Sequence, residues 1–330
     1  MIDQSCLFQA RKIERLTLIM RRKMLFIYNP NAGRGRIRTK LSQILEIFLR
    51  TDCEVVIYPT RQKMDAREIA KEYATQNGCD TIVCSGGDGT LNEVVGGLME
   101  VGCSLPVGYI PSGTTNDFGY SLNIPKDMEK AAEIIVKGAT LLCDVGSMNN
   151  SYFTYTAAFG LFTDVSYDTP QNFKNVLGRM AYILSGISKL HSVKVYHLRI
   201  EHEDEVVEDD FIYGMLANSN SIGGFRGITG SQVLLNDGLF ELILIRRPHN
   251  LVELSGIVND LMHNVITGKH IYYHRVHSVK ISSESDMPWS LDGEYGGTTT
   301  EANIVIHKQA IPYICDRTEL LEAKETLESL

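Results

Sequence analysis

The sequence predicts an α/β protein, with a doubly wound parallel sheet in its first half and a mainly antiparallel β domain in its second. Its 330 residues correspond to about two domains at ~150 residues each. Up to about residue 145, short apolar segments alternate with amphipathic ones, a pattern typical of a parallel sheet covered by helices on both faces. After that point the segments are strand-like and joined by acidic or glycine turns, which predicts antiparallel pairing.

The elements of the first half are placed by hydrophobic periodicity. The helix after the first strand is representative, because its apolar positions Ile37, Leu41, Ile44, Leu45 and Phe48 recur at helical spacing. The same reasoning predicts strands at 24–28, 54–58, 80–85 and 106–110, and further helices near 64–76, 90–100 and 127–137. Ligands of such sheets bind beyond the carboxyl ends of the strands. Three loops should therefore lie together, at 29–36, 86–90 and 111–117.

The second half is predicted to consist mainly of strands, at 152–159, 193–200, 211–217, 239–245, 276–282 and 302–307, interrupted by helical stretches near 174–190 and 249–266. The last residues have the spacing of a short amphipathic helix. We therefore expect four parts: a flexible basic extension (1–23), an α/β domain (24–145), a β-rich domain (146–315) and a tail helix (316–330). The active site is expected in the cleft between the two domains.

The charge pattern indicates an anionic partner near the amino end. The net charge is −8 and 44% of the residues are hydrophobic, typical of a globular protein and unlike a general nucleic-acid binder, which carries a basic excess. Residues 1–40 nevertheless hold ten Lys and Arg against Asp3 and Glu14, a local charge of +8. This favours phosphate or an anionic lipid surface, with a plain solvated arm as the alternative. No apolar run approaches the ~20 residues that cross a bilayer, so a membrane would be met from its surface.

The seven cysteines indicate a reducing compartment. They are scattered, odd in number and contain no CxxC pair, which makes a poor disulfide framework. We expect free thiols in the cytoplasm. The apolar run 16–20 is shorter than the 7–15-residue core of a signal peptide, so secretion is not expected.

The strongest motif is a strand that runs through paired glycines into a helix, at Gly86-Gly87-Asp88-Gly89-Thr90. Glycines let the backbone approach a phosphate, and a helix amino terminus presents free N–H groups to it. The carboxylate of Asp88 is suited to hold a cation or a water against that phosphate. The motif is neither a Walker loop nor a dinucleotide fingerprint. A β-turn with a helix N-cap is the alternative interpretation.

Two further loops follow strands and carry polar side chains. Loop 29–36 combines turn formers with Arg34 and Arg36, and arginine matches phosphate oxygens in a fork geometry. Loop 111–119 offers hydroxyls, an amide and a carboxylate. Each alone is compatible with a plain connection, but three such loops at one sheet edge predict a site for a phosphate-bearing ligand.

Five segments together resemble the ordered signatures of the diacylglycerol kinase catalytic family: 29–33 (NPNAG), 85–93 (SGGDGTLNE), 113–118 (GTTNDF), 236–239 (NDGL) and 291–294 (LDGE). Within this family the chain is most similar to the soluble bacterial diacylglycerol and lipid kinases, relatives of the sphingosine and ceramide kinases. The likeness extends from residue 24 to about residue 310.

The resemblance implies ATP-dependent phosphorylation of a lipid hydroxyl, with diacylglycerol converted to phosphatidic acid as the expected reaction. It implies that 24–145 is the nucleotide-binding domain and that 146–315 is the lipid-binding and catalytic domain. It implies that Glu294 is the general base, and that a structural Mg²⁺ is held by the carboxylate of Asp237 and the main-chain carbonyls of Leu234 and Leu239. Asp88 would act in catalysis by holding metal or water near the β- and γ-phosphates. The nucleotide contacts implied are Asn29, Pro30, Asn31, Ala32, Gly33, Thr60, Gly86, Gly87, Asp88, Gly89, Thr90, Leu91, Asn92 and Thr114.

The expected cofactors are ATP and Mg²⁺. The expected partner is a lipid at the inner face of the membrane, with which the protein would associate peripherally. Nucleic-acid binding is not expected, and a homodimer is compatible with the family. Other acylglycerols, undecaprenol-like alcohols and sphingoid bases stay open as substrates. Two alternatives remain: an NAD kinase-like enzyme, which shares the GGDGT turn, and a non-catalytic nucleotide or lipid sensor that docks through its basic end.

Three histidines, His270, His274 and His277, have a spacing that resembles a metal site. In the predicted strand, His277 points to the opposite face from the other two, because side chains alternate along a strand. We therefore do not interpret these three as a zinc site.

Overall fold

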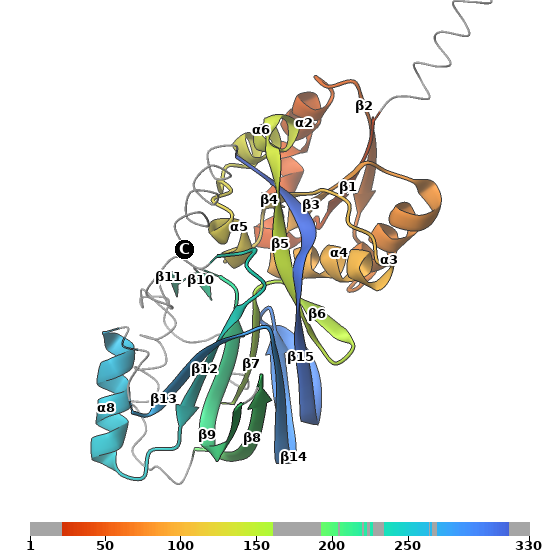
Figure 1. Cartoon of the computed structure of the whole chain (residues 1–330). Coiled ribbons are helices and arrows are strands. Elements are labelled where there is room, and N and C mark those ends of the chain that lie inside the picture. Colours follow the sequence, from red (N-terminus) through yellow and green to blue (C-terminus); the bar gives the residue numbers. More distant parts are fainter. Residues whose placement is uncertain are drawn as a thin grey trace, which may run out of the picture.

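The computed structural model describes residues 22–160, 193–203, 205–219, 221–222, 225–226, 234–263, 265 and 269–316. Two layered regions lie one above the other in Figure 1. The predicted helix near 174–190, the tail helix and almost all of the basic extension lie outside the described residues.

The first region is built on four parallel strands in the order β4-β3-β1-β2. They are β1 (Arg22–Tyr28), β2 (Cys53–Pro59), β3 (Thr81–Gly86) and β4 (Val107–Pro111). The helices are α2 (Ile37–Phe48), α3 (Asp65–Glu72), α4 (Asp88–Glu100), α5 (Asp117–Ser121) and α6 (Met128–Lys137), with short helical turns η1 (Ala32–Gly35) and η2 (Tyr73–Asn77). The predicted strands and helices of this half are thus confirmed, except that the helix predicted near 64–76 ends at Glu72 and continues as one wider turn.

Helices cover both faces of this sheet. Strand order reverses at β1, because the chain moves from β1 outward to β2 and then back to β3. Right-handed crossovers therefore place α2 and α3 on opposite faces. In agreement, α2 packs against α6 and α3 against α4 (Figure 1). This arrangement is the predicted doubly wound sheet, and it leaves the carboxyl ends of β1, β3 and β4 free to form a site.

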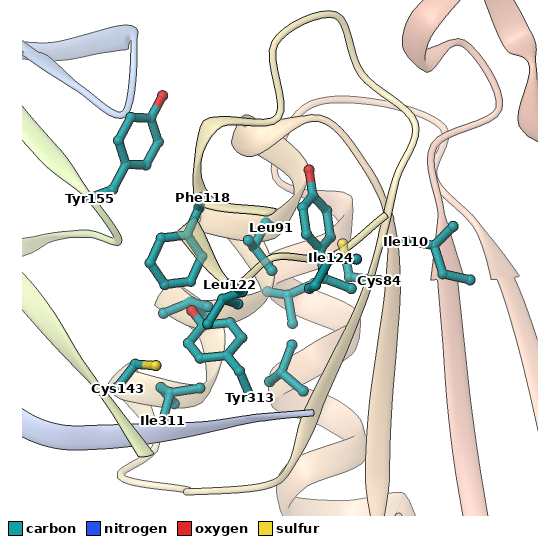
Figure 2. Packing of buried hydrophobic residues seen from close by; sticks show 14 of the residues in the cluster. Cys84, Leu91, Ile110, Phe118, Leu122, Ile124, Cys143, Tyr155, Ile311 and Tyr313 are labelled. Atoms are coloured by element: carbon teal, nitrogen blue, oxygen red, sulfur yellow. The ribbon is translucent and has the colours of Figure 1, made fainter. Parts of the chain in front are cut away.

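Local sequence explains where the helices begin and which face they bury. Asp127 caps α6, since its carboxylate accepts hydrogen bonds from the backbone N–H groups of Glu129 (3.0 Å) and Lys130 (3.2 Å). Helix α4 buries Leu91 and Leu98, seven residues apart, together with the residues between them on the same face. Leu91 belongs to a hydrophobic cluster in which the rings of Phe118 and Tyr313 lie 4.9 Å apart (Figure 2).

The second region is mainly antiparallel. Its strands are β5 (Ala139–Met148), β6 (Ser151–Phe153), β7 (Thr156–Gly160), β8 (Tyr196–His202), β9 (Glu205–Ala217), β12 (Phe240–Arg246), β13 (Ile271–Val276), β14 (Ser278–Leu291) and β15 (Glu294–Cys315), with the small hairpin β10 (Ser221–Ile222) and β11 (Phe225–Arg226) and the helix α8 (Leu251–Met262). The predicted strand at 152–159 is divided into β6 and β7, and that at 302–307 is part of a much longer strand. The predicted antiparallel character is confirmed.

Strand β15 belongs to both regions (Figure 1). Its first half pairs with β14, its second half pairs with β5, and Tyr313 pairs with Val107 of β4. One sheet therefore runs from β13 to β2, and the domain boundary that we expected near residue 145 falls inside β5. The pairing of β15 with β5 shifts register between His307 and Ile311, where Gln309 has a φ of +52°.

Candidate active site

The three predicted loops lie together at the carboxyl ends of the parallel strands. The backbone N–H of Asn29 donates to the carbonyl oxygen of Ser85 (2.8 Å), and that of Ser112 donates to the carbonyl oxygen of Gly86 (2.8 Å). The loop after β2 joins them, because the N–H of Thr60 donates to the carbonyl oxygen of Tyr28 (2.9 Å). All four strand ends thus form one edge, as the rule for parallel sheets requires.

Close backbone approach between these loops depends on glycine. Gly33 has a φ of +52°, and a Cβ atom built there would lie 1.9 Å from the carbonyl oxygen of Ser112. No residue with a side chain fits this position without moving the neighbouring loop. Glycine is therefore required at position 33, at the end of the segment 29–33, for a steric reason.

A cavity of about 670 Å³ lies beside this edge, between the loops and the turn that joins β14 to β15. Of the residues expected to contact nucleotide, ten line it: Asn29, Asn31, Ala32, Gly33, Thr60, Gly87, Gly89, Thr90, Asn92 and Thr114. Pro30, Gly86, Asp88 and Leu91 are described by the structure and do not line it. Leu91 instead points into the hydrophobic cluster of Figure 2.

Glu294 reaches this cavity from the second region. It begins β15, and its carboxylate lies above the first turn of α4, where a Cβ built on Gly89 would lie 3.3 Å from Oε1. Its Oε2 accepts a hydrogen bond from Nζ of Lys63 at 2.8 Å. The expected base and the expected phosphate turn are therefore neighbours, although they are about two hundred residues apart in sequence.

Asp292 fastens this turn to the first region, a role that its place in the motif 291–294 does not reveal. Its buried carboxylate accepts hydrogen bonds from the backbone N–H groups of Thr154 (2.7 Å), Tyr155 (2.9 Å) and Thr156 (3.0 Å), and from Nδ2 of Asn92 (2.6 Å). Burial raises the pKa of Asp292, and the backbone N–H donors oppose that rise. The break between β6 and β7 supplies those donors.

Asp88 begins α4 but turns away from the cavity. Its carboxylate accepts hydrogen bonds from Oγ1 of Thr115 (3.1 Å) and from the N–H of Phe118 (3.3 Å), and its residue is 7% exposed. Burial, followed by the charge of Asp117, raises its pKa to about 6. Its catalytic role stays a prediction.

The cations at the cavity differ from those that the sequence suggested. Arg34 and Arg36 do not line it, whereas three residues from the loop after β2 and from α3 do: Arg61, Lys63 and Arg67. Arg61 is paired with Asp65 and Arg67 with Glu100, which leaves Lys63 as the cation paired with a residue of the second region. The resemblance marks Thr60 of this loop but no motif marks its cations, which is why sequence reasoning missed Lys63.

The turn expected to hold Mg²⁺ lies before β12. The Oδ1 atom of Asp237 accepts a hydrogen bond from the N–H of Leu239 (2.9 Å), and its Oδ2 is paired with Arg275. The buried carboxylate of Asp144 accepts a hydrogen bond from the N–H of Gly238 at 2.6 Å, and burial raises its pKa to about 6. The metal set of Asp237 with the carbonyl groups of Leu234 and Leu239 stays a prediction.

Glu241 is a buried acid of this region, and one of its carboxylate oxygens lacks a hydrogen-bond donor among the described residues. Its residue is 4% exposed, and its Oε2 atom has no hydrogen-bond partner among the described residues. Burial raises its pKa to about 7, against the opposing charge of Arg275. The carboxylate oxygens of Asp144, Asp237 and Glu241 suit a hard divalent cation in donor chemistry, with Arg275 as the competing cation.

A doubly wound sheet whose glycine turn faces a polar cavity, with a carboxylate presented from a second, β-rich region, defines a kinase-like arrangement. None of the helices in the described part of the chain is long and apolar enough to span a bilayer. A model of the diacylglycerol kinase catalytic domain matches residues 23–148. A model described as the YegS C-terminal NAD kinase beta sandwich-like domain matches residues 161–313.

Curated relatives carry the likeness over most of the chain. The diacylglycerol kinase of Staphylococcus saprophyticus is 37% identical over 280 residues, covering 84% of this chain and 90% of the relative. That of Staphylococcus carnosus is 36% identical over 312 residues, covering 92% and 99%. The crystal structure of a diacylglycerol kinase from Bacillus anthracis has a TM-score of 0.70 at 22% identity, covering 90% of this chain and 97% of that chain.

The chain belongs to the diacylglycerol kinase family and is an enzyme, a lipid kinase of that family. The predicted resemblance is therefore confirmed. The likeness to NAD kinase is confined to the fold of the second region, since the catalytic-domain model and the relatives above all name diacylglycerol kinase. The alternative of a non-catalytic nucleotide or lipid sensor is not supported, because the catalytic-domain model and the curated relatives identify an enzyme.

Proposed function

We propose that the protein transfers the γ-phosphate of ATP to the free hydroxyl of diacylglycerol and releases phosphatidic acid. The observation that carries this proposal is the position of Glu294, whose carboxylate lies above the first turn of α4 at the edge of the cavity. A phosphoryl group bound at that turn and a hydroxyl beside the carboxylate would meet at one point. The names of the relatives support the choice of lipid.

The cavity supplies what a nucleoside triphosphate needs. Gly87 and Gly89, at the start of α4, line the cavity, and the free N–H groups of a helix amino terminus are suited to bind phosphate oxygens. Arg61, Lys63 and Arg67 add positive charge on the same side. Asn29, Thr60 and Thr114 are the polar contacts for the rest of the nucleotide.

Glu294 is the proposed general base. Its carboxylate would accept the proton of the lipid hydroxyl as the oxygen attacks the γ-phosphorus, and ADP would leave on the far side. The hydrogen bond from Lys63 to this carboxylate, with the charge of Glu294, raises the pKa of Lys63. Asp292 is the proposed positioning residue, because its five hydrogen bonds hold the turn that carries Glu294.

Asp237, with the carbonyl groups of Leu234 and Leu239, is the proposed site of a structural Mg²⁺. When bound, such an ion would neutralise the buried acids of this turn. The unpartnered Oε2 atom of Glu241 and the nearby carboxylate of Asp144 support a cation here. Arg275 would have to release the Asp237 carboxylate for the ion to bind. A second Mg²⁺ would arrive with ATP.

The lipid is proposed to reach the cavity from the inner face of a membrane, with the enzyme attached peripherally and located in the cytoplasm. Two exposed residues at the cavity support this orientation: Met64 (39% exposed) and Tyr295 (72% exposed). The six cysteines in the described residues are free thiols, in keeping with a reducing compartment. A homodimer and the absence of nucleic-acid binding stay predictions, to be measured by sedimentation and by titration with DNA.

The test is a turnover assay with radiolabelled ATP and mixed micelles that contain one acceptor at a time. The panel is diacylglycerol, monoacylglycerol, an undecaprenol-like alcohol, a sphingoid base and soluble NAD⁺. We expect the highest kcat/KM with diacylglycerol. Preferred phosphorylation of another lipid would correct the substrate, and phosphorylation of NAD⁺ alone would overturn the lipid acceptor.

A further inference from the structure

A second constellation of ligating side chains lies in the β-rich region, away from the cavity. His202 ends β8, Glu205 begins β9, and His274 lies on β13. The nitrogen and oxygen atoms that these three offer all lie within 4.8 Å of one another. None of the three lines the cavity described above, so the constellation is separate from the kinase site.

Two of the three ligand-atom distances are close to those of a tetrahedral metal centre, and all three are within 4.8 Å. The Oε2 atom of Glu205 lies 3.9 Å from Nε2 of His202 and 3.6 Å from Nε2 of His274. Zinc bonds of about 2.0–2.1 Å at tetrahedral angles place neighbouring ligand atoms about 3.3 Å apart. Small side-chain rotations would therefore bring the two histidines and the glutamate onto one ion.

The backbone pre-positions these ligands. His202 and Glu205 pair directly across the β8–β9 hairpin, and the imidazole rings of His202 and His274 lie 4.8 Å apart. The hydroxyl of Tyr272 lies 2.6 Å from Nε2 of His202 and adds a fourth polar group beside the same nitrogen. The constellation therefore joins a hairpin to a strand that is paired with neither of its arms.

His202 is the buried member of the three. Its side chain is 2% exposed, and its Nδ1 atom has no hydrogen-bond partner among the described residues. The neutral imidazole is the form that binds metals. Glu205 and His274 remain about half exposed, which gives an ion and a water access from solvent.

We propose that His202, Glu205 and His274 form a binding site for a divalent transition metal, with zinc as the ion that best fits two imidazoles and one carboxylate. Nitrogen ligands select against Mg²⁺ and Ca²⁺, which take oxygen. Water, or the hydroxyl of Tyr272 after it releases His202, completes the coordination. The ion would tie the β8–β9 hairpin to β13 in the second region, independently of the kinase reaction.

The experiment compares wild type with two matched single-histidine variants of the full chain. His274→Ala removes a ligand, whereas His277→Ala removes an exposed histidine three residues away that faces Glu203 instead, at 3.4 Å. Metal bound per chain is measured after dialysis against ZnCl₂, and thermal midpoints are measured with ZnCl₂ and with MgCl₂. The visible spectrum with Co²⁺ reports coordination directly, because tetrahedral Co²⁺ absorbs strongly.

We expect one Zn²⁺ per wild-type chain, a zinc-dependent rise in the thermal midpoint and a tetrahedral Co²⁺ spectrum. His277→Ala should keep all three, and His274→Ala should weaken zinc binding by at least about 10-fold. Glu205→Gln, at an exposed position, provides a second ligand variant if His274→Ala folds poorly by circular dichroism. Equal zinc binding in wild type and both ligand variants would assign the ion to other groups, such as the free thiols, and would overturn the proposal.

Discussion

Lys63 and Glu294 form an ion pair across the cavity, with 2.8 Å between Nζ and Oε2. The two residues are 231 positions apart, one on the loop after β2 and the other at the start of β15. Both side chains are more than half exposed, so the pair contributes little to the stability of the fold. It can therefore open at low cost when a phosphate or a hydroxyl enters.

Replacing Glu294 with glutamine should abolish most turnover while the protein stays folded. The amide keeps the shape of the side chain but does not accept the proton of the lipid hydroxyl, and removal of a positioned base costs about 10²–10⁴-fold in kcat. The matched control is Glu301→Gln, an exposed glutamate of the same strand that pairs with Lys280. Steady-state kinetics with diacylglycerol micelles provide the measurement, and a wild-type kcat for Glu294→Gln would remove it as the base.

Replacing Lys63 with methionine should raise the KM for ATP by about 10- to 100-fold, because a charge-assisted hydrogen bond to phosphate contributes about 1.5–3 kcal/mol. The thermal midpoint should stay near that of wild type, since the exposed ion pair adds at most about 1 kcal/mol. Lys40→Met, which breaks an exposed pair with Glu129 away from the cavity, is the control. An unchanged KM in Lys63→Met would show that Lys63 serves Glu294 alone.

Asp88 should make the stability of the fold fall between pH 5 and pH 7.5. Its pKa of about 6 in the folded state exceeds the ordinary value of about 4, so the native protein holds the proton to higher pH than the unfolded chain. Stability contributed in this way is present at low pH and lost as pH rises through 6. Asp88→Asn should therefore gain about 1–2 kcal/mol relative to wild type over this interval, at about 1.4 kcal/mol per pKa unit. Chemical denaturation of both proteins at the two pH values measures the difference, and an identical pH response would contradict the shift.

Asp237→Ala should separate two requirements for Mg²⁺. We expect the nucleotide-free wild type to melt at a higher temperature with Mg²⁺ than without, by mass action on the folded state, and the variant to lose that response together with turnover. Binding of ATP to the first region, measured by calorimetry, should persist. Asp209→Ala, which removes the partner of Arg246 in the same region, is the control. An equal Mg²⁺ response in wild type and Asp237→Ala would leave 236–239 as an ordinary turn.

Much of the fold follows from local pattern. The helix that begins at Ile37 and the strand that ends at Gly86 have the periodicity of their elements, and the rule for parallel sheets places their loops together without any contact information. These parts of the structure depend on neighbours a few residues away.

The unpredicted parts depend on distant pairing. The carboxylate of Asp292 finds its donors at residues 154–156, and Lys63 finds Glu294, only after the sheets have formed. Strand β15 likewise looks in sequence like a six-residue apolar segment, because most of its first half is exposed and polar. The partners of His274 come from β8 and β9 for the same reason, and no spacing within 270–277 marks them.

The unbroken course of β15 connects the proposed base to the parallel sheet of the first region. Glu294 lies at one end of the strand, and the other end pairs with β4 of the parallel sheet and with β5. The pairing of this strand with β5 is interrupted at one place, the register shift between His307 and Ile311. Asp144 contacts this register shift, because its Oδ1 atom accepts a hydrogen bond from the N–H of Gln309 at 2.7 Å. Its Oδ2 atom accepts a hydrogen bond from the N–H of Gly238, in the turn that contains Asp237. If Glu294 moves towards the phosphates, we expect β15 to bend at this register shift, beside the carboxylate that also contacts the proposed metal turn.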